Sequence, residues 1–109
     1  MTEKVCDNII SSLGTCEILC QLAEEASELA QAALKLRRAI DGKNPTPKTV
    51  EECRDAIIEE IADIEVCKYL LGFCNTEVCD EVLKIFDRKK KRWAERISER
   101  GKNDSKRSD

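Results

Sequence analysis

The apolar residues of this chain recur at alternating steps of three and four over long stretches, which is the spacing of one face of an α-helix. The longest series lies within residues 15–40 and consists of Leu19, Leu22, Ala26, Leu29, Ala33, Leu36 and Ile40. A shorter series precedes it and consists of Val5, Ile9 and Leu13, followed by Gly14. The pattern predicts a short first helix and a long second helix.

The segment 41–47 contains residues that stop helices. Gly42 is a favoured residue after a helix end, and the prolines that follow it cannot donate a backbone hydrogen bond, so we predict a loop there. Thr49 and Glu52 have the spacing of a capping box, in which side chains and backbone amides bond reciprocally. A third helix is therefore predicted to begin beside Thr49.

The third and fourth predicted helices each have an apolar face. The third reaches about residue 73 with the series Val50, Cys53, Ile57, Ile64, Cys67 and Leu71. The fourth begins near Asn75 and carries Val78, Val82, Ile85, Phe86 and Trp93. We predict one domain over residues 1–98 and, because the chain is polar beyond it, a disordered tail over residues 99–109. No strand-like alternation is present, so the predicted fold class is all-α.

Composition narrows the functional classes. Charged residues form 38% of the chain and aromatic residues 4%, which suits helices with aliphatic faces better than a β-sandwich. The net charge of -3 argues against a nucleic-acid-binding protein, because phosphate neutralisation needs a concentrated positive face. No apolar run approaches the roughly 20 residues that span a bilayer, and no signal peptide is recognisable. We therefore expect a cytoplasmic protein with no membrane partner.

The chain contains 7 cysteines and no histidine. The number of cysteines is odd and no Cys-x-x-Cys spacing occurs, which argues against a disulfide framework or a zinc site. Several cysteines fall at apolar positions of the helical series, where a free thiol behaves as a small hydrophobic residue. Reduced thiols that fill the core are the preferred interpretation.

Two carboxylate pairs lie on the second and third predicted helices. Glu25 and Glu28 are three residues apart, as are Glu60 and Asp63, and residues at this spacing lie on the same side of a helix, about one turn apart. If the two helices pack antiparallel, the pairs can face each other. A single pair at this spacing is more often a solvated acidic face than a binding site.

The position of Glu60 favours a binding site over a solvated acidic face, because steps of three and four place it inside the apolar stripe of the third helix. A bare carboxylate at such a position is costly unless it is paired or bound to a metal ion. Glu25 and Asp63 fall at the borders of their stripes, whereas Glu24 and Glu59 are predicted to point outward. An oxygen-only cluster suits Mg²⁺ or Mn²⁺ rather than zinc, and the lack of histidine excludes a di-iron carboxylate bundle.

The segments Glu24-Glu25-Ala26-Ser27-Glu28 and Glu60-Ile61-Ala62-Asp63 together resemble a known family signature. The chain is similar, over about residues 15–97, to the MazG-like nucleotide pyrophosphohydrolases, the all-α superfamily related to dimeric dUTPases. The resemblance implies a four-helix bundle completed by oligomerisation, as a homodimer or homotetramer. It also implies Mg²⁺-dependent hydrolysis of a nucleoside triphosphate to the monophosphate and pyrophosphate, through attack of water on the α-phosphorus.

The resemblance also implies roles for particular residues. Four carboxylates would hold Mg²⁺, namely Glu25, Glu28, Glu60 and Asp63. Glu24 would help to orient the attacking water, and Lys89 and Arg92 would bind the substrate phosphates. Many relatives carry glycine at the position of Ser27, and the basic residues here form a run, Arg88 to Arg92, that leaves the register of the phosphate-binding pair open.

Two alternatives remain open at the level of sequence. One is a non-catalytic helical interaction module of the same fold, which has no need of an inward Glu60 and should show no Mg²⁺-dependent stabilisation. The other is a related enzyme that acts on a different phosphoanhydride, because the motifs contact only phosphate and metal and do not select a base or sugar.

Overall fold

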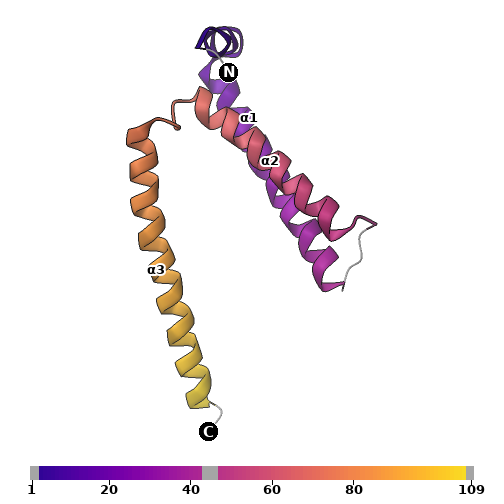
Figure 1. Ribbon diagram of the computed structural model, residues 1–109, viewed down its shortest axis with the longest axis vertical. Helices are drawn as coiled ribbons and strands as arrows, with labels where there is room; N and C mark the ends of the chain where they lie inside the picture. The colour runs from indigo at the N-terminus through magenta and orange to yellow at the C-terminus, as the bar shows by residue number, and fades with distance from the viewer. Residues whose placement is uncertain (1–2, 43–46, 108–109) are drawn as a thin grey trace. The chain divides into compact units, whose positions relative to one another are not determined.

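The computed structural model describes residues 3–42 and 47–107, with side chains as far as residue 103. The described residues form three α-helices and no strand: α1 (Glu3–Asp41), α2 (Val50–Leu70) and α3 (Thr76–Arg107) (Figure 1). The predicted all-α fold class is therefore confirmed. The chain divides into two compact units, Met1–Phe73 and Cys74–Asp109, and each is described by itself.

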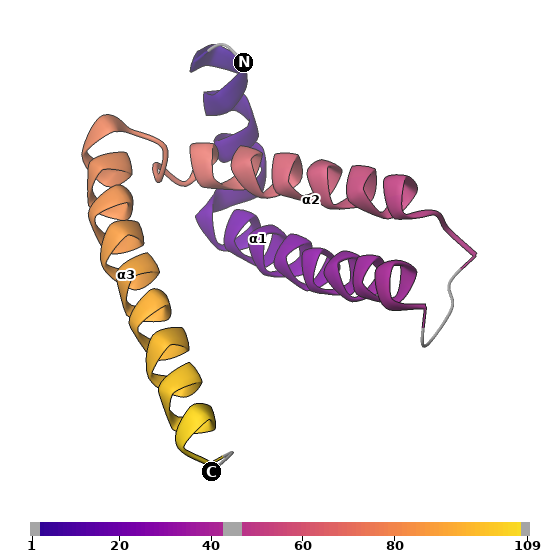
Figure 2. The same cartoon turned by 60° about the horizontal axis from the view of Figure 1, so that its bottom comes forward.

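The predicted break between the first two helices lies inside α1. Gly14 has φ 78° and ψ 159°, a backbone conformation that is essentially restricted to glycine, and it kinks α1 so that its N-terminal segment departs from the line of the rest (Figure 2). Gly42 also has a positive φ, of 68°, directly after the end of α1. Of the predicted loop, residues 43–46 lie outside the described residues.

Both ends of α2 follow from their sequence. The Thr49 side-chain oxygen accepts a hydrogen bond from the Glu52 backbone amide at 3.1 Å, and the Glu52 carboxylate accepts one from the Thr49 amide at 3.2 Å. The predicted capping box is thus confirmed. At the other end Gly72 has φ 83°, and the Phe73 amide donates to the Lys68 carbonyl at 2.9 Å, which closes α2 with a Schellman motif.

Helices α1 and α2 run antiparallel and pack side by side along most of α2 (Figures 1 and 2). The face of α1 that packs against α2 contains buried or half-buried Ile18, Leu22, Glu25, Leu29, Ala32 and Leu36. The opposing face of α2 contains buried or half-buried Cys53, Ile57, Glu60, Ile64, Cys67 and Leu71. Glu60 therefore lies within the apolar stripe of α2, as predicted.

The predicted contact face of α1 is wrong by one residue in places. Ala26 and Ala33 are exposed, and their neighbours Glu25 and Ala32 take the inner positions. The reason is that α1 carries two adjacent apolar stripes, and periodicity alone cannot choose between them. The observed register brings Glu25, which is half-buried, into the packed face, whereas the sequence placed it at the border.

The core of this helix pair is small. Its buried residues are Cys6, Ile18, Ala32, Cys53 and Cys67. All seven cysteines have free thiols, so three of them fill the core as predicted. That interpretation is wrong for Cys16, Cys20 and Cys79, which are exposed.

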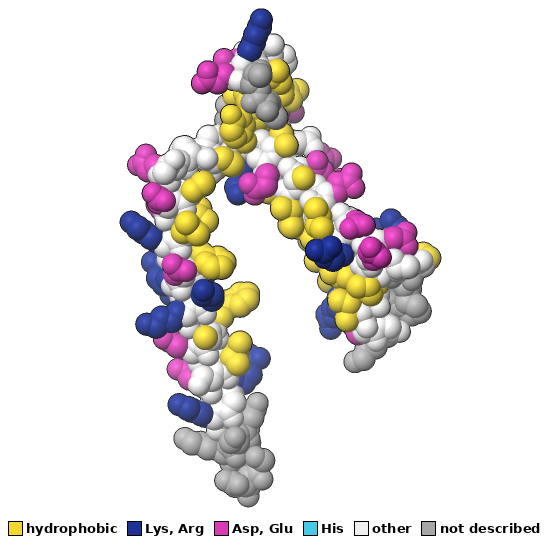
Figure 3. Space-filling view, in the orientation of Figure 1, with side chains coloured by type: hydrophobic (Ala, Val, Ile, Leu, Met, Phe, Trp, Pro, Cys, Tyr) yellow, Lys and Arg dark blue, Asp and Glu magenta, His cyan; other side chains and the backbone are white. Residues whose placement is uncertain are grey.

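Helix α3 extends further than its composition predicts. The segment from Gly101 to Arg107 is helical, where a disordered tail was expected; it continues an established helix, and propagation is far less costly than nucleation. Hydrophobic side chains gather along one side of α3 (Figure 3). The exposed members are Val82, Leu83, Ile85, Phe86, Trp93 and Ile97. In the part of the chain that is described, no helix is long and apolar enough to cross a membrane.

Candidate functional site

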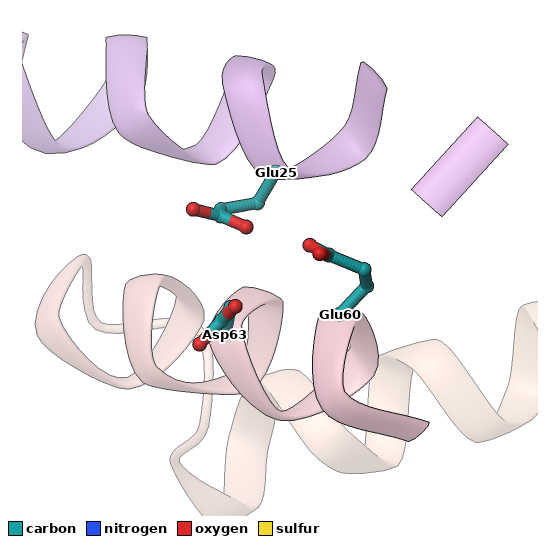
Figure 4. Close-up of side chains that lie close together, drawn as sticks. All are labelled: Glu25, Glu60 and Asp63. Atoms are coloured by element: carbon teal, nitrogen blue, oxygen red, sulfur yellow. The ribbon is translucent and has the colours of Figure 1, made fainter. Parts of the chain in front are cut away.

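Three carboxylates from two helices converge where α1 packs against α2. Glu25 extends from α1 towards Glu60 and Asp63 on α2 (Figure 4). Each contributes one oxygen to a set in which all the atoms lie within 4.8 Å of one another. We call Glu25, Glu60 and Asp63 the acidic cluster. The antiparallel packing creates it, because Glu25 and Glu60 both occupy inner positions of their helices.

The two inner carboxylates of the acidic cluster have unsatisfied oxygens. When both carboxylates are ionised, Oε2 of Glu25 and Oε2 of Glu60 are buried and have no hydrogen-bond donor among the described residues. The other oxygen of Glu25 accepts a hydrogen bond from the Gln21 side chain at 2.8 Å. Leaving buried carboxylate oxygens unpaired is costly, so the cluster favours uptake of a proton or a cation.

The pKa values of Glu25 and Glu60 are shifted in opposite directions by their interaction. The pKa of Glu60 is raised from 4.5 to about 7, chiefly because its protonated carboxyl donates a hydrogen bond to ionised Glu25 and secondly because burial penalises its charge. The same hydrogen bond lowers the pKa of Glu25. As the pH falls below about 7, a proton on Glu60 therefore links the two carboxyl groups.

The third carboxyl of the acidic cluster, Asp63, and two neighbouring groups also have raised pKa values. The pKa of Glu28 is raised, first by the charge of Glu25 and then by burial. The pKa of Asp63 is raised by burial and by the charge of Glu25. Burial also raises the pKa of the Cys67 thiol, with a further contribution from Glu25 and Asp63. Negative charge is thus concentrated here beyond what the side chains can balance among themselves.

The donor set fits a small, hard divalent cation. All donors are carboxylate oxygens, which Mg²⁺ and Mn²⁺ prefer. Opposite ligands of an octahedral Mg²⁺ are about 4.2 Å apart, since each bond is about 2.1 Å. Adjacent ligands are closer, about 3.0 Å apart, so the three oxygens, which lie within 4.8 Å of one another, would have to move together to bind one ion. The buried Oε2 atoms of Glu25 and Glu60 are then the atoms that a cation would satisfy.

A cavity of about 250 Å³ opens beside the acidic cluster, between α1 and the start of α2. Its lining residues are Glu28, Gln31, Ala32, Lys35, Lys48, Cys53, Ala56 and Glu60. Glu60 belongs to both the cluster and the cavity, so a cation held by the cluster would border this space.

The other predicted site residues are distributed differently. Glu28 lies next to the acidic cluster and lines the cavity, but it is not among the three converging carboxylates. Glu24 is exposed on α1. Lys89 and Arg92 are exposed on α3, in the other unit of the chain, so their part in phosphate binding stays a prediction.

Sequence reasoning did not single out Gln21, Lys35 or Lys48. Gln21 precedes Glu25 by one helical turn, which is the spacing that allows the observed hydrogen bond. Lys35 lies two turns beyond Glu28 on the same side of α1, a spacing that could have been noticed. Lys48 lies just before the first residue of α2, and no periodic signal marks it.

Comparisons with protein-family models, with curated proteins and with solved structures found no significant match to this chain.

Proposed function

We propose that this chain is a Mg²⁺-dependent nucleoside triphosphate pyrophosphohydrolase that uses the acidic cluster of α1 and α2. The observation that carries the proposal is the approach of the Glu25 and Glu60 carboxylates from two helices, each with a buried oxygen that has no hydrogen-bond donor while both groups are ionised. A purely structural helix contact gains nothing from such a pair. The carboxylate spacing shared with MazG-like enzymes supplies the reaction type.

In this proposal the carboxylates have distinct tasks. Glu25, Glu60 and Asp63 would hold the cation, and Glu28, at the rim of the cavity, would complete its binding. When bound there, Mg²⁺ or Mn²⁺ would offset charge on the phosphate oxygens and make water a better nucleophile. Gln21 fixes the orientation of Glu25 through the 2.8 Å hydrogen bond. Exposed Glu24 is the proposed residue for orienting the water that attacks the α-phosphorus.

Lys89 and Arg92 of α3, which belongs to the other unit of the chain, are also proposed phosphate ligands. A shallow apolar pocket on α3 is lined by Phe86, Lys89, Lys90 and Trp93. The Lys90 ammonium lies 5.5 Å from the centre of the Phe86 ring. Positive charge and aromatic surface are therefore close together on this helix. This combination suits the anionic and aromatic parts of a nucleotide.

The product pattern tests the proposed reaction. With Mg²⁺ and a panel of common and modified nucleoside triphosphates, the expected products are the nucleoside monophosphate and pyrophosphate in equal amounts. Chromatography of the nucleotide and a pyrophosphate assay measure both. A nucleoside diphosphate with orthophosphate as the sole products, or no turnover of any substrate, would exclude this function.

We also propose that the chain works as a homodimer or homotetramer. The support is the exposed apolar surface on both units, which includes Leu19 and Leu34 on α1 and Trp93, 69% exposed, on α3. The interaction-module alternative draws on the same surface, but it does not account for the unpartnered Glu60 oxygen. Light scattering at low micromolar concentration should give at least twice the chain mass; a fully helical, fully active monomer would contradict the proposal.

A further inference from the structure

The cavity beside the acidic cluster is lined by charges of both signs. Glu28, Gln31 and Lys35 succeed one another along one side of α1, and the α2 side is lined by Cys53, Ala56 and Glu60. Lys48 adds a second positive charge from just before α2. Because α1 and α2 are antiparallel, Glu28 and Glu60 mark one end of the cavity, and Lys35 and Lys48 mark the other.

The dimensions of the cavity limit what it can hold. Lys35 lies seven residues beyond Glu28, or about 10 Å along the helix axis at 1.5 Å per residue. The volume of about 250 Å³ lies below the roughly 300–1,000 Å³ of pockets that enclose a drug-sized ligand. A short chain of phosphates fits this space, and the nucleoside would lie outside it.

The two ends of the cavity carry opposite charges and therefore attract different groups. The carboxylate end attracts a cation and repels phosphate, so an anionic chain needs compensation elsewhere. Lys35 and Lys48 form no ion pair with another described residue, and a lysine ammonium is an effective point-charge ligand for phosphate. Among the acidic residues, Glu52 is the one that interacts with Lys48. The pKa of Glu52 is lowered chiefly by its hydrogen bond with the Thr49 amide, and the charge of Lys48 makes a smaller contribution. Glu52 is itself held in the capping box, so Lys48 stays available.

We propose that Lys35 and Lys48 bind the β- and γ-phosphates of the substrate, the part that leaves as pyrophosphate. This inference rests on the proposed function and adds the residues that hold the leaving group. It places the α-phosphorus towards Glu60 and the acidic cluster, with the rest of the phosphate chain directed along the cavity. It also supplies two phosphate ligands from the same unit as the acidic cluster, independently of Lys89 and Arg92 on α3.

Inorganic pyrophosphate is the probe that tests this assignment. Titration calorimetry with Mg²⁺ present should show that Lys35→Gln/Lys48→Gln binds pyrophosphate at least about tenfold more weakly than the parent, since charge-assisted contacts are lost. The stabilisation of this variant by Mg²⁺ alone should match the parent. The conservative variant Lys35→Arg/Lys48→Arg should retain most of the affinity. Arg37→Gln removes a positive charge from the outer side of α1, where Arg37 bonds only weakly to Asp41 at 3.7 Å, and is the matched control.

The outcomes separate this inference from the function on which it rests. Equal pyrophosphate affinity in Lys35→Gln/Lys48→Gln and in Arg37→Gln, or no pyrophosphate binding by the parent, overturns the role of the lysines. A parent that shows no response to Mg²⁺ overturns the proposed metal site instead. In that case the same titration without metal still decides the lysine assignment, because affinity lost only in the lysine variant supports it and unchanged affinity refutes it. Both lysines are exposed, so the variants should keep the helicity of the parent in circular dichroism.

Discussion

Replacing Glu60 with Gln is expected to lower pyrophosphate release by at least about a hundredfold, the loss typical when a group that stabilises developing charge is removed. The metal-free variant should be as stable as the parent or more stable. The reason lies in the acidic cluster, where Glu60 adds charge beside Glu25 and Asp63 and leaves a buried oxygen unpartnered. The side-chain amide that this substitution introduces can donate a hydrogen bond to Glu25 without carrying charge. Turnover assays and thermal denaturation in EDTA measure the two effects.

The pH dependence of stability provides a second readout on the same variant. Because the Glu60 pKa is about 7 in the folded chain and near 4.5 when unfolded, the folded state binds more protons between these values. The free energy of unfolding of the metal-free parent should therefore decrease as pH rises through that window. Glu60→Gln should flatten this decrease, whereas the control Glu59→Gln, an exposed neighbour on α2, should leave it unchanged. A pH profile that is identical in both variants would mean that Glu60 holds no shared proton.

Ile18→Ala should cause the largest loss of stability in the helix pair. Ile18 is 3% exposed, and it is the one large aliphatic side chain among the buried residues of the described chain. Truncating a buried isoleucine to alanine typically costs about 2–5 kcal/mol. In so small a core that is a large part of the total stability, and denaturant unfolding should show a clear shift in midpoint.

Leu19→Ala is the matched control for Ile18→Ala because it removes a similar side chain one position along α1. Leu19 is 46% exposed, so its truncation should cost distinctly less than that of Ile18. The comparison also tests the helix register, since the periodic series in the sequence runs through Leu19 and the packed face runs through Ile18. If Leu19→Ala were the more damaging of the two, the observed packing of α1 against α2 would be wrong.

Local signals in the sequence predicted local structure well. Gly14 marked the break in α1, and Thr49 with Glu52 marked the start of α2, because each signal acts through backbone geometry within a few residues. The inward place of Glu60 was also predictable, since the series Cys53, Ile57, Ile64 and Cys67 runs through its position on α2.

Features that depend on packing between elements were less predictable. On α1 two apolar stripes lie side by side, and the choice between Glu25 and Ala26 as the inner residue depends on the partner helix. The cavity and its lysines were missed for the same reason, because Lys35 and Lys48 share it only once α1 and α2 pack. The carboxylates of the candidate site could therefore be predicted from their spacing in the sequence. The two lysines could not, because only the packing of the helices brings them beside the carboxylates.

The most direct test of the central claim, that the acidic cluster is a divalent-cation site, is the unfolding free energy of the parent measured with and without Mg²⁺. At roughly a hundred times its dissociation constant, Mg²⁺ should add about 2.7 kcal/mol, because it binds only the folded arrangement. The increment should persist in Glu59→Gln and shrink sharply in Glu60→Gln. An equal Mg²⁺ increment in both variants, or none in the parent, would show that Glu60 is not a ligand and that the proposed site is wrong.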